Sequence, residues 1–200
     1  MIEVIFSIII LIFSVVIHEV SHGLMADRLG DPTARLSGRL TLNPIGHLDW
    51  FGSIILPLLT YNLGGFIIGW AKPVPYNPYN LKGRFSEALV ALAGPVSNLI
   101  IAVVFGLVIR TAGVWVLPNS LFQISVAIVM INIILAVFNL VPIPPLDGSK
   151  ILFALIPYRF GQIRVWLERY SLALVIIFIF FLWQFIAPLA GIVFRLITGI

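Results

Sequence analysis

The chain has 200 residues, of which 60% are hydrophobic and only 10% are charged, and its mean hydropathy is +1.12. About a quarter of the residues in a typical soluble domain are charged, so this composition excludes an ordinary soluble protein and indicates an integral membrane protein. The formal net charge is +4, but the basic residues are scattered and form no nucleic-acid-binding motif, so we expect no nucleic-acid partner. The chain has no cysteine, so any metal site must use His, Asp or Glu ligands.

The first apolar run, residues 4–25, is predicted to be a retained membrane-spanning helix. It is long enough to cross a bilayer core, and it follows Glu3 where a signal peptide would have a positive start. Near its end lies the sequence His18-Glu19-Val20-Ser21-His22. Residues four apart in a helix lie one above the other, so both histidines point at one spot with Glu19 beside them.

This HExxH pattern is typical of a zinc site, with two imidazole ligands and a carboxylate that can accept a proton from activated water. Ionisable residues inside a membrane span are costly and usually functional, which favours a metal site over a set of solvated polar residues. We therefore expect one Zn²⁺ per chain, with His18 and His22 as metal ligands and Glu19 as the general base.

The sequence between residues 35 and 50 has a different pattern. Apolar and polar residues alternate in part between 36 and 42, which predicts a short membrane-associated β hairpin or strand. The loop that follows contains His47 and Asp49, and either could supply a further metal ligand. Nothing in the sequence fixes them relative to His18, so a polar loop at the membrane interface is the favoured interpretation.

Residues 51–70 are apolar but are interrupted by Pro57 and by the sequence Tyr61-Asn62-Leu63-Gly64-Gly65. The resulting pieces are about ten residues or fewer, which is too short to cross a bilayer as helices. We expect a re-entrant segment, which must be buried in protein or line a water-filled cavity. The proline-rich residues 72–78 are interpreted as a stiff surface connection.

Three further spans are expected, at residues 86–109, 121–141 and 172–187, with an amphipathic stretch at 150–169. Asn98 could join two helices or bond a ligand, and the residues alone favour the first role. Asn139 precedes a proline-rich break in the chain, and Asp147 follows it. Because a catalytic zinc has three protein ligands and one open position, Asp147 is the candidate third ligand.

Charge counting favours four crossings, with both termini outside the cell. If residues 51–70 do not cross, ten Lys and Arg residues lie on one side and two on the other, which is the bias expected of cytoplasmic loops. If they cross fully, the division is seven against five. The first topology also places His22 and Asp147 at the same membrane face, near the cytoplasm.

Three segments together resemble the site-2 protease family of intramembrane zinc metalloproteases. They are His18-Glu19-Val20-Ser21-His22, Ala93-Gly94-Pro95 with Asn98, and Asn139-Leu140-Val141-Pro142-Ile143-Pro144-Pro145-Leu146-Asp147-Gly148. The resemblance covers nearly the whole chain and is to the short branch of the family, which lacks PDZ and CBS domains.

The resemblance implies hydrolysis of peptide bonds in or near transmembrane segments of membrane-protein substrates. It implies that the zinc ligands are His18, His22 and Asp147. It also implies that Glu19 is the general base. Two asparagines, Asn98 and Asn139, would hold the substrate or polarise its carbonyl.

We therefore expect an α-helical integral membrane protein with about four transmembrane helices, a re-entrant segment and a short β hairpin. It would form a single domain over residues 1–200 in the cell membrane, with the lipid bilayer and a transmembrane protein substrate as partners. The alternative is a non-enzymatic metal-binding or metal-transporting protein that uses the same His/Asp site. A transporter is expected to show internal repeats or ionisable residues spread across the bilayer, and the sequence shows neither.

Overall fold

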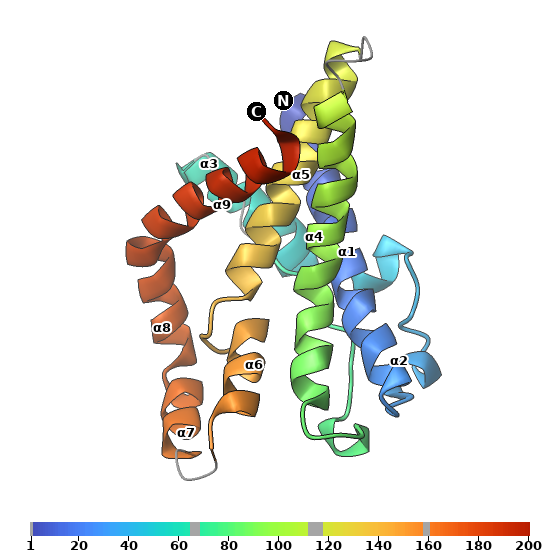
Figure 1. Ribbon diagram of the computed structural model, residues 1–200, viewed down its shortest axis with the longest axis vertical. Coiled ribbons are helices and arrows are strands. Elements are labelled where there is room, and N and C mark those ends of the chain that lie inside the picture. The colour runs from blue at the N-terminus through green and yellow to red at the C-terminus, as the bar shows by residue number, and fades with distance from the viewer. Residues whose placement is uncertain (1, 65–68, 112–117, 158–160) are drawn as a thin grey trace.

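The computed structural model describes residues 2–64, 69–111, 118–157 and 161–200, and helices dominate it (Figure 1). Three of these helices are long and apolar enough to cross a membrane. They are α1 (Ile2–Arg28), α4 (Ser86–Thr111) and α5 (Asn119–Asn139). The first three predicted spans are thus confirmed as helices, and the protein is an α-helical membrane protein.

The fourth predicted span is a bent pair of helices. α8 (Ser171–Ile177) leads through a π-helical segment, η5 (Phe178–Leu182), into α9 (Trp183–Thr198), and the two arms meet at 67°. The expected end at residue 187 is wrong, because α9 continues beyond it to Thr198. Packing explains the difference: α9 lies against α4 and α5 and buries Ala190, which extends the helix past Pro188.

The core of the bundle lies where α4, α5 and α9 meet. Its fully enclosed side chains are small or β-branched and comprise Ala102, Ile109, Val129, Ile133 and Ala190. Small residues let membrane helices approach closely, and Gly106 of α4 is an example. A Cβ atom at this glycine would collide with the side chain of Ile197 on α9.

The apolar segment from Trp50 to Gly64 is divided into two short helical pieces. It forms a π-helical segment, η2 (Trp50–Ile55), and a nine-residue helix, α3 (Leu56–Gly64), which is too short to cross a bilayer. The Trp70 amide donates to the Gly52 carbonyl at 3.0 Å, so both ends of the segment lie together. The re-entrant path stays a prediction, since residues 65–68, which connect the two ends, lie outside the described residues.

The predicted β hairpin at residues 35–50 is wrong. No residue that the structure describes forms a β-strand; this stretch holds the end of α2 (Thr33–Leu36) and a 3₁₀ turn, η1 (Pro44–His47). Leu36 is 79% exposed, so the alternation of apolar residues does not mark a buried face. The extended backbone pairs with a side chain instead of a strand, because Arg39 donates to the carbonyl oxygens of Gly46, Lys72 and Pro73.

The remaining helices are short and lie at one end of the bundle. They are η3 (Pro78–Asn80), α6 (Asp147–Leu155) and α7 (Gly161–Arg169), and the last two cover most of the predicted amphipathic stretch. Figure 1 shows both termini at the end of the bundle where α4 is followed by α5, with α2, α6 and α7 at the opposite end.

Candidate metal centre

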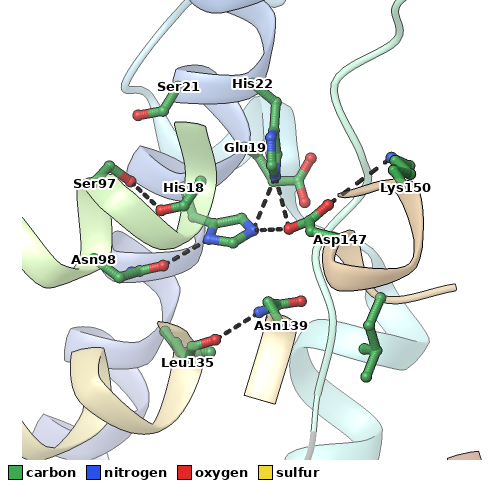
Figure 2. Close-up of polar contacts among 12 residues, drawn as sticks. His18, Glu19, Ser21, His22, Ser97, Asn98, Leu135, Asn139, Asp147 and Lys150 are labelled. Carbon is green, nitrogen blue, oxygen red and sulfur yellow. Dashed lines mark hydrogen bonds and ion pairs between the residues drawn. The ribbon is translucent and has the colours of Figure 1, made fainter. Parts of the chain in front are cut away.

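Two helices bring the three predicted metal ligands together. His18 and His22 lie one turn apart on α1, and Asp147 is the first residue of α6 (Figure 2). The two Nε2 atoms are 3.0 Å apart, and Asp147 Oδ2 lies 3.1 Å from that of His18 and 3.2 Å from that of His22. All three residues are buried. In the part of the chain that the structure describes, they are the group able to hold a metal ion.

The proline-rich connection between α5 and α6 places Asp147 next to α1. The chain leaves α5 after Asn139, and the Leu146 amide then bonds the Ile143 carbonyl at 2.9 Å. Gly148 is required for this path, since a Cβ atom there would collide with the carbonyl group of Leu140. The Asp-Gly pair therefore serves close packing as well as the turn that its sequence suggests.

The outer nitrogen of each imidazole faces a hydrogen-bond acceptor. His18 Nδ1 lies 2.6 Å from Asn98 Oδ1, and His22 Nδ1 lies 2.7 Å from the Val90 carbonyl oxygen. A carbonyl oxygen can only accept, so both Nδ1 atoms carry the proton and donate. Both Nε2 atoms then present lone pairs to the centre, which is the tautomer that a metal ion requires.

The residues present fit a zinc ion. Two imidazole lone pairs and a carboxylate oxygen within 3.0–3.2 Å of one another repel unless a cation lies among them. In a tetrahedral zinc site with bonds of about 2.0–2.1 Å, neighbouring ligand atoms lie about 3.3 Å apart, close to the spacing seen here. The set of two His and one carboxylate is also a common zinc-binding combination.

Glu19 lies beside the histidines and is not one of the three converging ligands (Figure 2). Its Oε2 accepts a hydrogen bond of 2.9 Å from the Val74 amide, and its side chain is half-buried. A carboxylate next to a metal centre but free of the metal is suited to proton transfer.

The two predicted asparagines occupy different surroundings. Asn98 is fully buried behind His18, and its Nδ2 donates to Asn132 Oδ1 at 2.8 Å and approaches the Ser14 carbonyl at 3.4 Å. Asn139 is half-buried near Asp147 (Figure 2), and its Nδ2 donates to the Leu135 carbonyl of its own helix.

Sequence reasoning missed the polar network behind His18. Asn132 donates from Nδ2 to Ser14 Oγ at 2.9 Å, so α1, α4 and α5 are joined there. One signal could have found Ser14: it lies four residues before His18, on the same face of α1 as the two ligands.

Gly94 explains how closely α4 approaches the metal ligands. A Cβ atom at Gly94 would lie 2.6 Å from His18 Nε2 and would collide with His22 Nε2. A glycine is therefore needed for α4 to pass directly over both imidazoles.

The other candidate ligands do not join the group. His47 is buried, and its Nε2 lies 2.8 Å from the Thr41 carbonyl oxygen, to which it donates. Asp49 accepts from the Gly52 amide at 2.7 Å as the cap of η2. The His47 side chain therefore bonds the loop that precedes η2, and the Asp49 side chain caps η2 itself.

Comparison with known proteins agrees with this geometry. A family model described as Peptidase family M50 matches residues 6–123 and 115–183. The chain is 40% identical over 193 residues, 93% of its length and 82% of the relative's, to a Bacillus subtilis protein named "Putative zinc metalloprotease YwhC". It is also 34% identical over 138 residues to a Mycolicibacterium smegmatis protein named "Putative zinc metalloprotease Rip2". This match covers 52% of that protein. No solved structure matches the chain.

The family model covers most of the chain, including both segments that supply the converging ligands. The family's peptidase chemistry requires the zinc ion that these residues fit, and it does not favour the metal-transport alternative. The chain belongs to peptidase family M50, and it is an intramembrane zinc metalloprotease of the site-2 protease type.

Proposed function

We propose that this single-domain protein cleaves transmembrane protein substrates at a site between α1, α4 and α6. The observation that carries the proposal is the convergence of His18, His22 and Asp147 from distant parts of the chain, with Glu19 beside them. These three ligands would hold zinc, which when bound would polarise a substrate carbonyl and make water a better nucleophile at neutral pH.

Glu19 supplies the proton transfers of the reaction. It accepts a proton as water attacks the peptide carbonyl carbon, and it passes that proton to the amine that leaves when the C–N bond breaks. The new carboxyl group gains the hydroxyl of the water and the new amine gains its proton. Glu19 therefore ends the reaction in the protonation state in which it began. Its half-buried position keeps it within reach of a substrate and close to the metal ligands.

The two asparagines have separate roles in this proposal. The contacts of Asn98 support orientation of His18, because its Oδ1 fixes the imidazole tautomer and its burial keeps it from the substrate. Asn139 is half-buried on the Asp147 side of the site, where its amide can bond the substrate backbone.

The active site would open towards the cytoplasm. The end of the bundle nearest Asp147 carries α2, α6 and α7 with basic residues such as Arg35, Lys150 and Arg164, whereas the opposite end carries Arg110 and Arg195. Cytoplasmic loops of membrane proteins are enriched in Lys and Arg, which favours this orientation and places both termini outside.

Comparative proteomics of membrane fragments tests the proposed substrate class. Cells that express the wild type should release fragments with new ends inside or beside transmembrane segments, and cells that express Glu19→Gln should not. Identical fragment sets in the two strains would contradict the proposal.

A further inference from the structure

The general base is in contact with a segment that lies far from it in the sequence. Residues 72–77, here called the strap, form no helix or strand and lead from Ala71 to η3. The strap crosses α1 at the level of the HExxH motif, where the Val74 amide donates to Glu19 Oε2 at 2.9 Å.

The sequence of the strap isolates this one donor. Pro73 and Pro75 flank Val74 and have no amide hydrogen, so Val74 provides the amide N–H of this three-residue stretch. Pro75 also restricts Val74 to extended conformations, which limits the directions in which the N–H can point.

Close packing against Gly23 fixes the position of Val74 along the axis of α1. Val74 is 5% exposed and lies against Gly23, one turn after Glu19 on the same helix face. A Cβ atom at Gly23 would approach Val74 Cγ1 to 2.7 Å, so a glycine is needed for the strap to lie this close.

Both ends of the strap are anchored. The Lys72 amide donates to the His47 carbonyl at 2.8 Å, and the Asn77 amide donates to Asp31 Oδ2 at 2.6 Å. Lys150 of α6 lies over the ring of Tyr76 at 5.1 Å, and its Nζ is 3.9 Å from Asp147 Oδ1. The strap is therefore joined to both helices that supply the metal ligands.

We propose that the Val74 amide is a positioning group for Glu19. It holds Oε2 in place and leaves Oε1, which has no hydrogen-bond partner among the described residues, as the atom that accepts the proton from water. An unrestrained Glu side chain has several rotamers, and a misplacement of about 1 Å can cost about 10²-fold in rate. The inference rests on the proposed role of Glu19 as the general base.

Hydrogen exchange tests the contact without using activity. In zinc-loaded protein in detergent, the Val74 amide should exchange at least about tenfold faster in Glu19→Ala than in the wild type, because a hydrogen bond to a charged group is lost. The Lys72 amide is the internal control, since its acceptor is unchanged. Equal exchange of the Val74 amide in both proteins, or equal acceleration at Lys72, would overturn the proposal.

Enzyme kinetics test the consequence. Val74→Pro removes the N–H and should lower kcat about 10-fold to 100-fold with KM and zinc per chain unchanged, because neither the metal ligands nor the substrate is touched. Ala71→Pro is the matched control, since the Ala71 amide has no partner in the described part of the chain, and its kcat should stay within about threefold of the wild type. Equal kcat for Val74→Pro and the wild type, or an equal loss in Ala71→Pro, would overturn the proposal.

These experiments distinguish a failure of the strap's role from a failure of the proposed function. Full activity of Glu19→Gln would contradict the role of the general base and leave the exchange result unaffected. Unchanged Val74 exchange would contradict the strap's role and leave the zinc protease assignment intact.

Discussion

Each histidine of the metal site uses both ring nitrogens. The inner Nε2 of His18 and of His22 faces the metal position, and the outer Nδ1 donates to Asn98 and to the Val90 carbonyl. Partners of this kind fix the ring orientation, and their loss typically costs about 10- to 100-fold in metal affinity or activity. The geometry of the metal site therefore depends on residues that do not themselves bind the metal.

The third ligand can be identified by zinc content. Asp147→Ala should lose most of the bound zinc, because it removes one of three converging atoms. His47→Ala should keep zinc near the wild-type ratio, because His47 bonds the Thr41 carbonyl and lies outside the group. Elemental analysis of detergent-purified variants gives the ratio, and the reverse ranking would show that the ligand comes from the other loop.

At the level of helices, the approach of α4 to α1 shapes the site. Gly94 stands directly over both imidazoles, where any side chain would occupy the space that they need. α1, α4 and α5 are further joined behind His18 by Asn98, Asn132 and Ser14. The geometry of the ligands is thus a property of helix packing.

A single methyl group at this contact should disrupt the site. Gly94→Ala would place a Cβ atom 2.6 Å from His18 Nε2, so we expect loss of most zinc and at least about a tenfold drop in cleavage. Gly191→Ala on α9 is the matched control, because nothing lies within 4 Å of its added Cβ. Normal zinc binding by Gly94→Ala would contradict the described packing.

Asp31, which anchors one end of the strap, predicts that the stability of the fold depends on pH. Burial raises the pKa of Asp31, but hydrogen bonds from Thr33, Asn80 and the Asn77 amide outweigh it and hold the pKa below its ordinary value. Ionised Asp31 therefore stabilises the fold above its unfolded pKa of about 3.9, and this contribution is lost as the pH falls through the folded pKa.

The difference in Tm between the wild type and Asp31→Asn measures this contribution. The difference should be constant between pH 7 and pH 5 and should shrink progressively below about pH 4. Thermal unfolding in detergent measures it, and a difference that grows on acidification would have the wrong sign.

The sequence predicted the elements whose cause is local. Long apolar runs predicted α1, α4 and α5, and the i, i+4 spacing of His18 and His22 placed both ligands on one face. The predicted hairpin failed because an extended stretch needs a partner strand, and Arg39 bonds its neighbours instead.

The contacts that sequence reasoning missed all depend on tertiary structure. The Val74 amide is a backbone group and leaves no residue-type signal, and 55 residues separate it from Glu19. Asn132 could be noted as a buried polar residue, but its bond to Asn98 follows only from the packing of α4 on α5. The bend between α8 and α9 likewise reflects packing of α9 across the bundle.

The whole molecule is asymmetric along its long axis. Both termini lie at the end where α4 is followed by α5, whereas α2, α6 and α7 lie at the other end (Figure 1). Asp147 begins α6, so the site lies towards the second of these ends. The orientation of this axis in the membrane decides which compartment receives the cleaved fragment.

Labelling of single cysteines tests the orientation, and the absence of native cysteine makes it direct. Cysteines placed at the exposed residues Ser37, Tyr79 and Gln162 should react with an impermeant thiol reagent only from the cytoplasmic side. A cysteine at Asn119, at the start of α5, should react only from outside. Reaction of Tyr79→Cys from outside would mean that residues 51–70 cross the membrane.

The central claim is that one zinc site with Glu19 beside it hydrolyses peptide bonds within the membrane. It is tested most directly by measuring zinc per chain and cleavage of a transmembrane reporter on the same vesicle-reconstituted wild-type and Glu19→Gln preparations. Glu19→Gln should keep the wild-type zinc ratio, because its three ligands remain, and should lose about 10²- to 10⁴-fold in cleavage rate. Cleavage at the wild-type rate by zinc-loaded Glu19→Gln would contradict the claim.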